Sequence, residues 1–247
     1  MRKYAWLILS AGLVLSLVGC GDSGSSNGGG SGGTAGSGGT AGSGGTAGSG
    51  GGTATVSGIV YAADDGDGTP FQGATVSVVG GASTTSVAGG VFSLEAPVGV
   101  AALVATAAGH WGELQIGDVP ATGLNDLEPE IVPDAMVTEV ADALMESVDP
   151  GKGIVGVEFA NPAAGDSADL GVSYGFAFVF DSADEPVVGT ELLPGGGGEV
   201  IFVNVDLGAD AMPSAKNAAD ADCTLDSADA SIPVQAKVIS SVFASCP

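Results

Sequence analysis

Basic side chains are scarce in this 247-residue chain, which has five lysines and arginines against 29 aspartates and glutamates. Two of the five, Arg2 and Lys3, stand at the very start, so three lysines serve the rest of the chain. Such an excess of negative charge is repelled by phosphate groups. Nucleic acid and anionic lipid headgroups are therefore poor partners, and we expect no binding to nucleic acid.

Histidine and cysteine are scarce too, with His110 as the single histidine and three cysteines. A zinc site would normally need more ligands of these two types. His110 stands beside Trp111, and we expect a half-buried structural pair there rather than a catalytic base. The low count of both residue types leaves little material for metal-assisted or acid–base catalysis.

Two short strings look like serine-hydrolase motifs but lack the context that such motifs need. Gly21-Asp22-Ser23-Gly24 lies in a stretch without apolar residues, where no rigid oxyanion hole can form. Gly171-Val172-Ser173-Tyr174-Gly175 matches G-x-S-x-G, which requires a strand-to-helix elbow and a later histidine. His110 lies upstream, and a chain with 44 glycines is expected to contain such strings by chance. The sequence predicts no enzyme.

What the chain does have begins with an apolar run from Tyr4 to Val18 that carries no charge and follows Arg2 and Lys3. This pattern is typical of an export signal, and the run is too short for a bilayer-spanning helix, which needs roughly 20 residues. The sequence Leu17-Val18-Gly19-Cys20 resembles the lipobox of bacterial lipoproteins. The resemblance implies a signal peptide over 1–19, cleavage before Cys20 and diacylglycerol on its thiol. An ordinary secretory signal with a chance cysteine is the alternative.

The predicted mature chain attaches to a membrane through lipid and not through charge. It keeps three lysines against 29 acidic residues, a net charge of −26. Two or three acyl chains give a stable anchor where one is marginal. Gly21 is not the aspartate of the familiar inner-membrane retention signal, so the resemblance favours the outer membrane, on its periplasmic face or at the cell surface.

Residues 20–54 are predicted to form a disordered linker. From Gly21 to Thr53 the chain is almost entirely Gly, Ser, Thr and Ala, with three copies of Ser-Gly-Gly-Thr-Ala-Gly between Ser31 and Gly48. Nothing there can bury apolar area to offset the entropy of ordering. A six-residue repeat can also mark a solenoid, but these copies have no large apolar side chain to stack.

Residues 55–120 show short strands at regular spacing with glycine turns between them. The segments 56–60, 73–78, 83–87, 91–94 and 100–107 alternate small or apolar with polar residues, and 113–116 is a further strand candidate. This spacing is typical of an antiparallel β-sandwich.

The same region resembles the carboxypeptidase regulatory-like domain, a transthyretin-like β-sandwich. The strings "VSGIVY", "GTPFQGATVSVVG", "TSVAGGVFSLEAPVG" and "ATAAGHW" carry the resemblance. It departs from the usual pattern at His110, where Tyr is customary, and at Ala88-Gly89, which replaces an acidic turn. The resemblance implies an accessory domain without catalytic residues. The matching positions are Gly58, Pro70, Gly73, Ala74, Val76, Gly90, Phe92, Leu94, Gly99 and Gly109.

Residues 121–150 are predicted to be a loop followed by an amphipathic helix. Met136, Val140 and Leu144 recur at four-residue spacing, Pro133 suits a first helical turn and Pro150 ends the pattern. We expect the apolar stripe to pack on a sandwich. A helix that binds a partner protein is the alternative.

Residues 151–247 are predicted to form a second β-sandwich, and two of its strings weakly resemble another copy of the first. Its strand candidates are 154–159, 170–180, 187–193, 200–205 and 234–243. The predicted fold class is thus all-β, with two antiparallel sandwich modules of transthyretin-like or Ig-like type joined by a short helical segment.

Cys223 and Cys246 remain as an even pair once Cys20 carries lipid, and export supplies an oxidising compartment. We expect a disulfide between them. Two independent thiols are the alternative, because spacing alone does not give geometry.

Acidic turns are the remaining candidates for a ligand site. Asp64, Asp65 and Asp67 could offer oxygen ligands to Ca²⁺, as could a second group. Neither has the twelve-residue loop of an EF-hand, so a solvated acidic loop is the alternative and no other cofactor is expected. The second group is Asp220, Asp222, Asp226 and Asp229.

These observations favour a non-catalytic, lipid-anchored envelope protein that presents β-sandwich modules for structural or adhesive contact with a protein or polysaccharide. The alternative is a carbohydrate-binding module of the starch-binding type. Sugar sites need exposed aromatic platforms, for which Trp111 and Tyr174 are the candidate ligand contacts.

Overall fold

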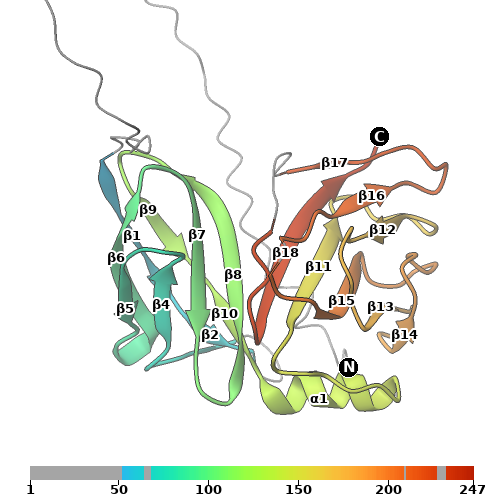
Figure 1. Cartoon of the computed structure of the whole chain (residues 1–247), viewed down its shortest axis with the longest axis horizontal. Helices are drawn as coiled ribbons and strands as arrows, with labels where there is room; N and C mark the ends of the chain where they lie inside the picture. The colour runs from blue at the N-terminus through green and yellow to red at the C-terminus, as the bar shows by residue number, and fades with distance from the viewer. Residues whose placement is uncertain (1–51, 64–67, 209, 227–231) are drawn as a thin grey trace, which may run out of the picture.

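The computed structural model describes residues 52–63, 68–208, 210–226 and 232–247. They form two β-rich modules that lie side by side, with one α-helix below the second module in the view of Figure 1. The predicted signal peptide, Cys20 and most of the predicted linker lie outside these residues. The fold class is all-β, as predicted.

The first module is a sandwich of two sheets. One sheet has the order β6–β1–β9, and the other has the order β5–β4–β7–β8–β10–β2–β3. Their bounds are β1 Thr53–Ile59, β2 Tyr61–Ala62, β3 Thr69–Pro70, β4 Thr75–Val78, β5 Ser83–Thr85, β6 Val91–Pro97, β7 Gly99–Thr106, β8 His110–Val119, β9 Leu124–Leu127 and β10 Glu130–Pro133; a 3₁₀ turn spans Ala88–Gly90.

The core of the first module follows the predicted period of two. Along β6 the side chains of Phe92, Leu94 and Ala96 are buried, and the residues between them are exposed. Val56 of β1 and Val76 of β4 face the same core. Alternate residues of a strand point to opposite faces, so this pattern buries one face of β6 and leaves the other in water. In β8 consecutive residues are buried, because Leu114 on its other face packs against Val238 of β18.

The prediction of loop alone between residue 121 and the helix is wrong, because β9 and β10 lie there. β9 pairs in parallel with β1, and β10 pairs with both β8 and β2. Both strands have only four residues, too few for a clear alternation. Their buried Leu127 and Ile131 belong to the first core, so this module continues past residue 120 to Pro133.

The predicted amphipathic helix is present as α1, Asp134–Ala143. It ends earlier than predicted because Met145 adopts a positive φ of 58° and the Glu146 N–H returns to the Ala141 carbonyl. Val137, Val140 and Leu144 form its buried stripe, which packs against the sheet of the second module.

The second module is built on a five-stranded sheet with the order β14–β13–β15–β11–β18. Helix α1 covers one face, and the two-stranded ribbon β12–β16 lies on the side of the other core. The strands predicted over 170–180 and 187–193 are shorter in the structure than expected. The bounds are β11 Gly153–Phe159, β12 Ser167–Asp169, β13 Phe176–Phe180, β14 Pro186–Val188, β15 Glu199–Val205, β16 Ser214–Lys216, β17 Thr224–Leu225 and β18 Val238–Ser245.

One sheet runs through both modules, which the sequence did not predict. β18 pairs in parallel with β11 on one side and with β8 of the first module on the other. Figure 1 shows β18 lying between these two strands. Most strand pairs are antiparallel. The parallel pairs are β1–β9, β10–β2 and the two that β18 makes with β8 and β11. The modules are therefore joined through backbone hydrogen bonds as well as through the chain.

Candidate functional site

Several predicted site residues lie outside the described residues. They are Cys20 and the predicted calcium ligands Asp64, Asp65, Asp67 and Asp229. Among the residues that are described, no three His, Cys, Asp or Glu side chains lie close enough together to hold a metal ion. Of the second acidic group, Asp220 forms an ion pair with Lys216 at 2.6 Å.

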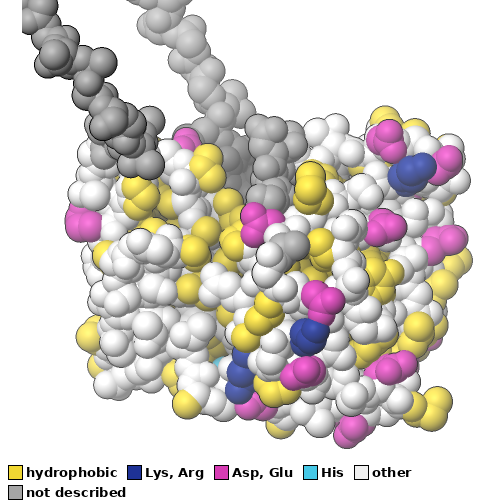
Figure 2. Space-filling view, viewed as in Figure 1, with side chains coloured by type: hydrophobic (Ala, Val, Ile, Leu, Met, Phe, Trp, Pro, Cys, Tyr) yellow, Lys and Arg dark blue, Asp and Glu magenta, His cyan; other side chains and the backbone are white. Residues whose placement is uncertain are grey.

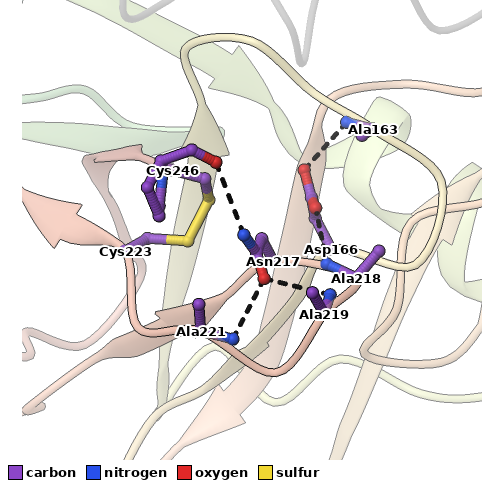
Figure 3. Close-up of a disulfide and its surroundings, with 9 residues drawn as sticks. Ala163, Asp166, Asn217, Ala218, Ala219, Ala221, Cys223 and Cys246 are labelled. Carbon is purple, nitrogen blue, oxygen red and sulfur yellow. Dashed lines mark hydrogen bonds between the residues drawn. A yellow bond between two sulfur atoms is a disulfide. The ribbon is translucent and has the colours of Figure 1, made fainter.

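The predicted disulfide between Cys223 and Cys246 is confirmed, with the two Sγ atoms 2.01 Å apart (Figure 3). Both cysteines are half-buried against the core of the second module. Next to the bridge, Thr224 of β17 pairs with Ser245 of β18. The disulfide therefore holds the polar segment before β17 on the end of the strand that joins the modules.

Two polar side chains form hydrogen bonds with the backbone around this loop (Figure 3). Asn217 Oδ1 accepts hydrogen bonds from the backbone N–H groups of Ala219 and Ala221, each at 3.0 Å. Asp166 is 1% exposed, and its two oxygens accept from Ala163 N at 2.8 Å and Ala218 N at 3.1 Å. Both groups are used in holding backbone, so this arrangement is structural.

Lys237 is the polar centre of the joint between the modules. Its Nζ donates to Asp134 Oδ2 of α1 at 2.8 Å. Its carbonyl accepts from Gly112 N of β8 at 2.9 Å, and its N–H donates to the Lys152 carbonyl at 2.8 Å. One residue thus connects β8, α1 and the segment that leads into β11.

Three glutamates lie on one face of the shared sheet, near the joint. Ile239 of β18 pairs with Glu113 of β8 and with Ile154 of β11. Glu158 lies four residues after Ile154, on the same face of β11, and pairs with Glu199 of β15. We call Glu113, Glu158 and Glu199 the glutamate row.

Two members of the glutamate row are buried and the third, Glu158, is half-buried. Glu113 is 7% exposed and Glu199 is 4% exposed. Glu113 Oε2 accepts a hydrogen bond from Glu130 N, whereas Glu158 Oε1 and Glu199 Oε2 are buried without a hydrogen-bond partner among the described residues. The Glu199 carboxyl lies over Gly156, where any Cβ would collide with Glu199 Oε1.

Burial dominates the protonation of this row. It raises the pKa of Glu113 to about 8, against the opposing effect of the Glu130 hydrogen bond. It also raises the pKa of Glu158 to about 7. The pKa of Glu199 lies well above its ordinary value, because burial and the neighbouring Glu158 both disfavour its charge. Removal from water disfavours the ionised form of a carboxyl group, so at pH 7 Glu113 is mostly neutral and Glu158 is about half ionised.

Sequence reasoning missed the row because its members are far apart in the chain. Each is a single glutamate among apolar or small residues of a strand, as in Gly112-Glu113-Leu114 and Glu199-Val200-Ile201. The signal that could have found them is a charged residue at a position where the alternation points inward. That signal does not show that the three lie on neighbouring strands.

The two aromatic residues predicted to contact a ligand differ in their exposure to solvent. Trp111 is 3% exposed and belongs to the apolar cluster beneath α1, so its ring is covered and the prediction for Trp111 is wrong. Tyr174 is 37% exposed and lies edge-on to Phe202 at 4.9 Å between ring centroids. Tyr174 stays a predicted contact.

The second hydrolase-like string does not meet the histidine. Ser173 lies in the loop before β13, and its carbonyl accepts from Asp206 N. His110, on β8 of the first module, is half-buried as expected: its ring lies edge-on to Phe71 at 4.9 Å, and its Nδ1 is 3.0 Å from the Ala108 carbonyl oxygen. No hydrogen bond joins Ser173 and His110 among the described residues.

A small pocket beneath α1 has an entirely apolar lining and offers no group for chemistry. It lies between the helix and the sheet of the second module. The lining residues are Val137, Val140, Ala141, Val148, Ile154, Phe176, Phe178, Ile201, Val203 and Ile239.

The one described α-helix, α1, has ten residues, and no helix among the described residues has the length and apolarity to cross a bilayer.

No protein-family model matches the chain, and no curated protein matches it in sequence. Among solved structures, the shaft pilin SpaA from Lactobacillus rhamnosus GG is 12% identical, with a TM-score of 0.26, over 78% of this chain and 97% of that one. The minor pilin GBS52 from Streptococcus agalactiae is 11% identical, with a TM-score of 0.20, over 78% and 95%. The Bacillus anthracis TIE protein is 12% identical, with a TM-score of 0.24; the match covers 66% of this chain but only 28% of that one. These scores are too low to transfer a function.

Proposed function

We propose that this chain is a non-catalytic, lipid-anchored envelope protein that presents its two modules as one stiff body for structural or adhesive contacts. The observation that carries the proposal is the shared sheet, in which β18 pairs with both β8 and β11. Two modules on a simple linker would move independently. Backbone pairing across the joint instead fixes their mutual orientation, as is needed to transmit force or to present a surface.

We further propose that the first module is a carboxypeptidase regulatory-like domain, since the residues that carry the resemblance have structural roles. Phe92, Leu94 and Val76 are buried in its core. At Gly58 any Cβ would collide with the Leu127 carbonyl of β9, so only glycine permits the β1–β9 pair. Gly90 has a positive φ of 74° and lies against the Val60 carbonyl. None of these positions is a catalytic one.

The anchor in this proposal is lipid on Cys20, with the outer membrane as its location. The charge distribution gives no alternative means of attachment: Figure 2 shows acidic side chains spread over the visible face, and the few lysine patches lie beside acidic ones. Each of the three described lysines is within 4 Å of an aspartate. Such a surface does not favour anionic headgroups.

The test is cell fractionation with mass spectrometry of the native chain and of Cys20→Ser. We expect the native chain in the membrane fraction with an acylated N-terminal peptide that begins at Cys20, and the variant in the soluble fraction. Cys246→Ser is the control, because it removes a cysteine but should stay membrane-bound. A Cys20→Ser chain that remains in the membrane after export contradicts the proposal.

The partner in this proposal is a protein or a polysaccharide. Trp111 is buried and cannot serve a starch-binding type of site, so of the two candidate rings only Tyr174 is exposed. A glycan array with the native chain and Tyr174→Ala separates the two classes: sugar binding that the substitution abolishes favours carbohydrate, and an empty array favours a protein partner.

A further inference from the structure

The joint between the modules is narrow. β18 is in register with β8 at only three positions, Val238, Ile239 and Ser240, whereas it is in register with β11 at six. Glu113 is the middle residue of the three on β8, opposite Ile239. The β8–β18 ladder, which joins the two modules, therefore has a buried carboxyl group at its centre.

The Gln115 side chain forms a hydrogen bond with this carboxyl group, and the charged groups that act on it are all acidic. Glu130 of β10 approaches through its backbone N–H, and both Glu130 and Glu158 act on Glu113 by repulsion. Glu199 of β15 stands opposite Glu158. β18 contributes Ser241 and Phe243 to this face and no charge.

The cations of the joint are engaged elsewhere. Lys237, at the start of β18, is paired with Asp134 of α1. Lys152 is paired with Asp206. The third described lysine, Lys216, pairs with Asp220 near the disulfide loop. No described ammonium group is therefore placed to neutralise the glutamate row if it ionises.

Ionisation of the row would place several negative charges on one buried face. Glu158 Oε1 and Glu199 Oε2 have no hydrogen-bond donor among the described residues, so a charge there would lack both water and a partner. A neutral carboxyl group can remain in that position at much lower cost. Burial of this face thus disfavours ionisation of the glutamate row, and ionisation of the row disfavours burial of the face.

We propose that the glutamate row is a proton-controlled lock on the joint: the β8–β18 ladder stays closed while these carboxyl groups carry protons and opens as they lose them. Once open, the modules remain connected through α1 and its flanking segments but lose their fixed orientation. The pKa values of about 7 for Glu158 and about 8 for Glu113 place the change just above neutral pH. The lock concerns the body itself and does not depend on lipid attachment.

The chain carries its own reporter for this joint. Trp6 and Trp111 are its two tryptophans, so in the full chain with Trp6→Phe the buried Trp111, two residues before Glu113, is the sole source of tryptophan fluorescence. From pH 5 to pH 9 we expect its emission to shift to longer wavelength and the radius of gyration from X-ray scattering to rise, both reversibly and with the same midpoint between pH 7 and 8. No change in either signal over this range overturns the proposal.

Three further variants, each in the Trp6→Phe background, identify the groups responsible. Glu113→Gln/Glu158→Gln/Glu199→Gln should remove the pH response and keep the closed emission up to pH 9. The matched control Glu128→Gln/Glu139→Gln/Glu146→Gln makes the same three substitutions at exposed positions and should respond like the parent chain. Glu158→Gln alone should move the midpoint to lower pH, because it removes the repulsion that disfavours ionisation of Glu113 and Glu199. If the first variant responds to pH like the parent chain, the proposal is overturned. If the first variant does not fold, an unchanged midpoint in Glu158→Gln overturns it.

Discussion

Lys237 Nζ lies 2.8 Å from Asp134 Oδ2, which connects the residue before β18 to the first residue of α1, 103 positions earlier in the chain. The lysine side chain is 31% exposed and the aspartate side chain 46%, so water screens the pair in part. Because the pair also lies where three backbone segments meet, it joins the helix to the joint between the modules.

The first prediction is that Lys237→Met lowers the free energy of unfolding by about 1 kcal/mol, since a half-buried charged hydrogen bond is lost. Lys216→Met is the control: its pair with Asp220 is more exposed, and we expect a change under about 0.5 kcal/mol. Urea unfolding of both variants measures the difference. Equal losses would show that Lys237 has no special role.

The second prediction concerns pH. The glutamate row has raised pKa values in the folded chain, so the folded state binds more protons than the unfolded state between pH 4.5 and about 8. The stabilisation is complete below pH 4.5 and is lost as the pH rises through the folded values, with a slope of up to about 1.4 kcal/mol per pH unit for each proton. Urea midpoints at several pH values measure the slope. It should be shallower in the glutamine triple variant than in the exposed control triple.

The third prediction is that reduction of the Cys223–Cys246 disulfide costs about 3 kcal/mol of stability, from the chain-entropy estimate for a loop of this length. Cys223→Ser and Cys246→Ser should each reproduce the loss, and the reductant should then have no further effect on either. Thiol titration of the denatured, unreduced Cys20→Ser chain should find no free thiol. Two free thiols would contradict the bridge.

The fourth prediction uses two strand glycines. Gly58→Ala should destabilise the chain by about 1–3 kcal/mol, because the new methyl group meets the Leu127 carbonyl and β9 must move. Gly117→Ala is the control, since it lies in β8 with nothing within 4 Å of the added Cβ. We expect the control to be neutral or slightly stabilising. Thermal unfolding distinguishes the two, and similar melting temperatures would contradict the argument.

The fifth prediction is that Ca²⁺ binds to Asp64, Asp65 and Asp67. Millimolar CaCl₂ should raise the melting temperature more than NaCl at equal ionic strength, because a cation bound to the folded state stabilises it. Asp64→Asn/Asp65→Asn/Asp67→Asn should abolish the difference between the salts. Equal shifts in the native chain would leave only screening.

Local features of this fold were predictable from the sequence, whereas long-range pairings were not. Alternation predicted the strands around Phe92 and Leu94, four-residue spacing predicted α1, and an even pair of exported cysteines predicted the disulfide. Each of these signals lies within a short window or in a count. The β8–β18 ladder pairs residues more than 120 positions apart, and nothing in a strand's own period names its neighbour.

The candidate site shows the same division. Glu113, Glu158 and Glu199 each interrupt an apolar strand, which indicates an inward-pointing charge, but only the strand order places them on one face. Trp111 shows the opposite error, because its residue type suggested a binding platform and its strand position buries it.

The place of β18 in the sheet also affects how the molecule is made. Any chain that stops before Val238 lacks the strand between β8 and β11, so the edge of β11 would be open at six positions and that of β8 at three. Open edges are templates for aggregation and for chaperone and protease attack. Synthesis of the final strand therefore completes the sheet of the second module and its joint to the first module in one step, and a chain truncated before it should be cleaved by proteases faster than the full chain.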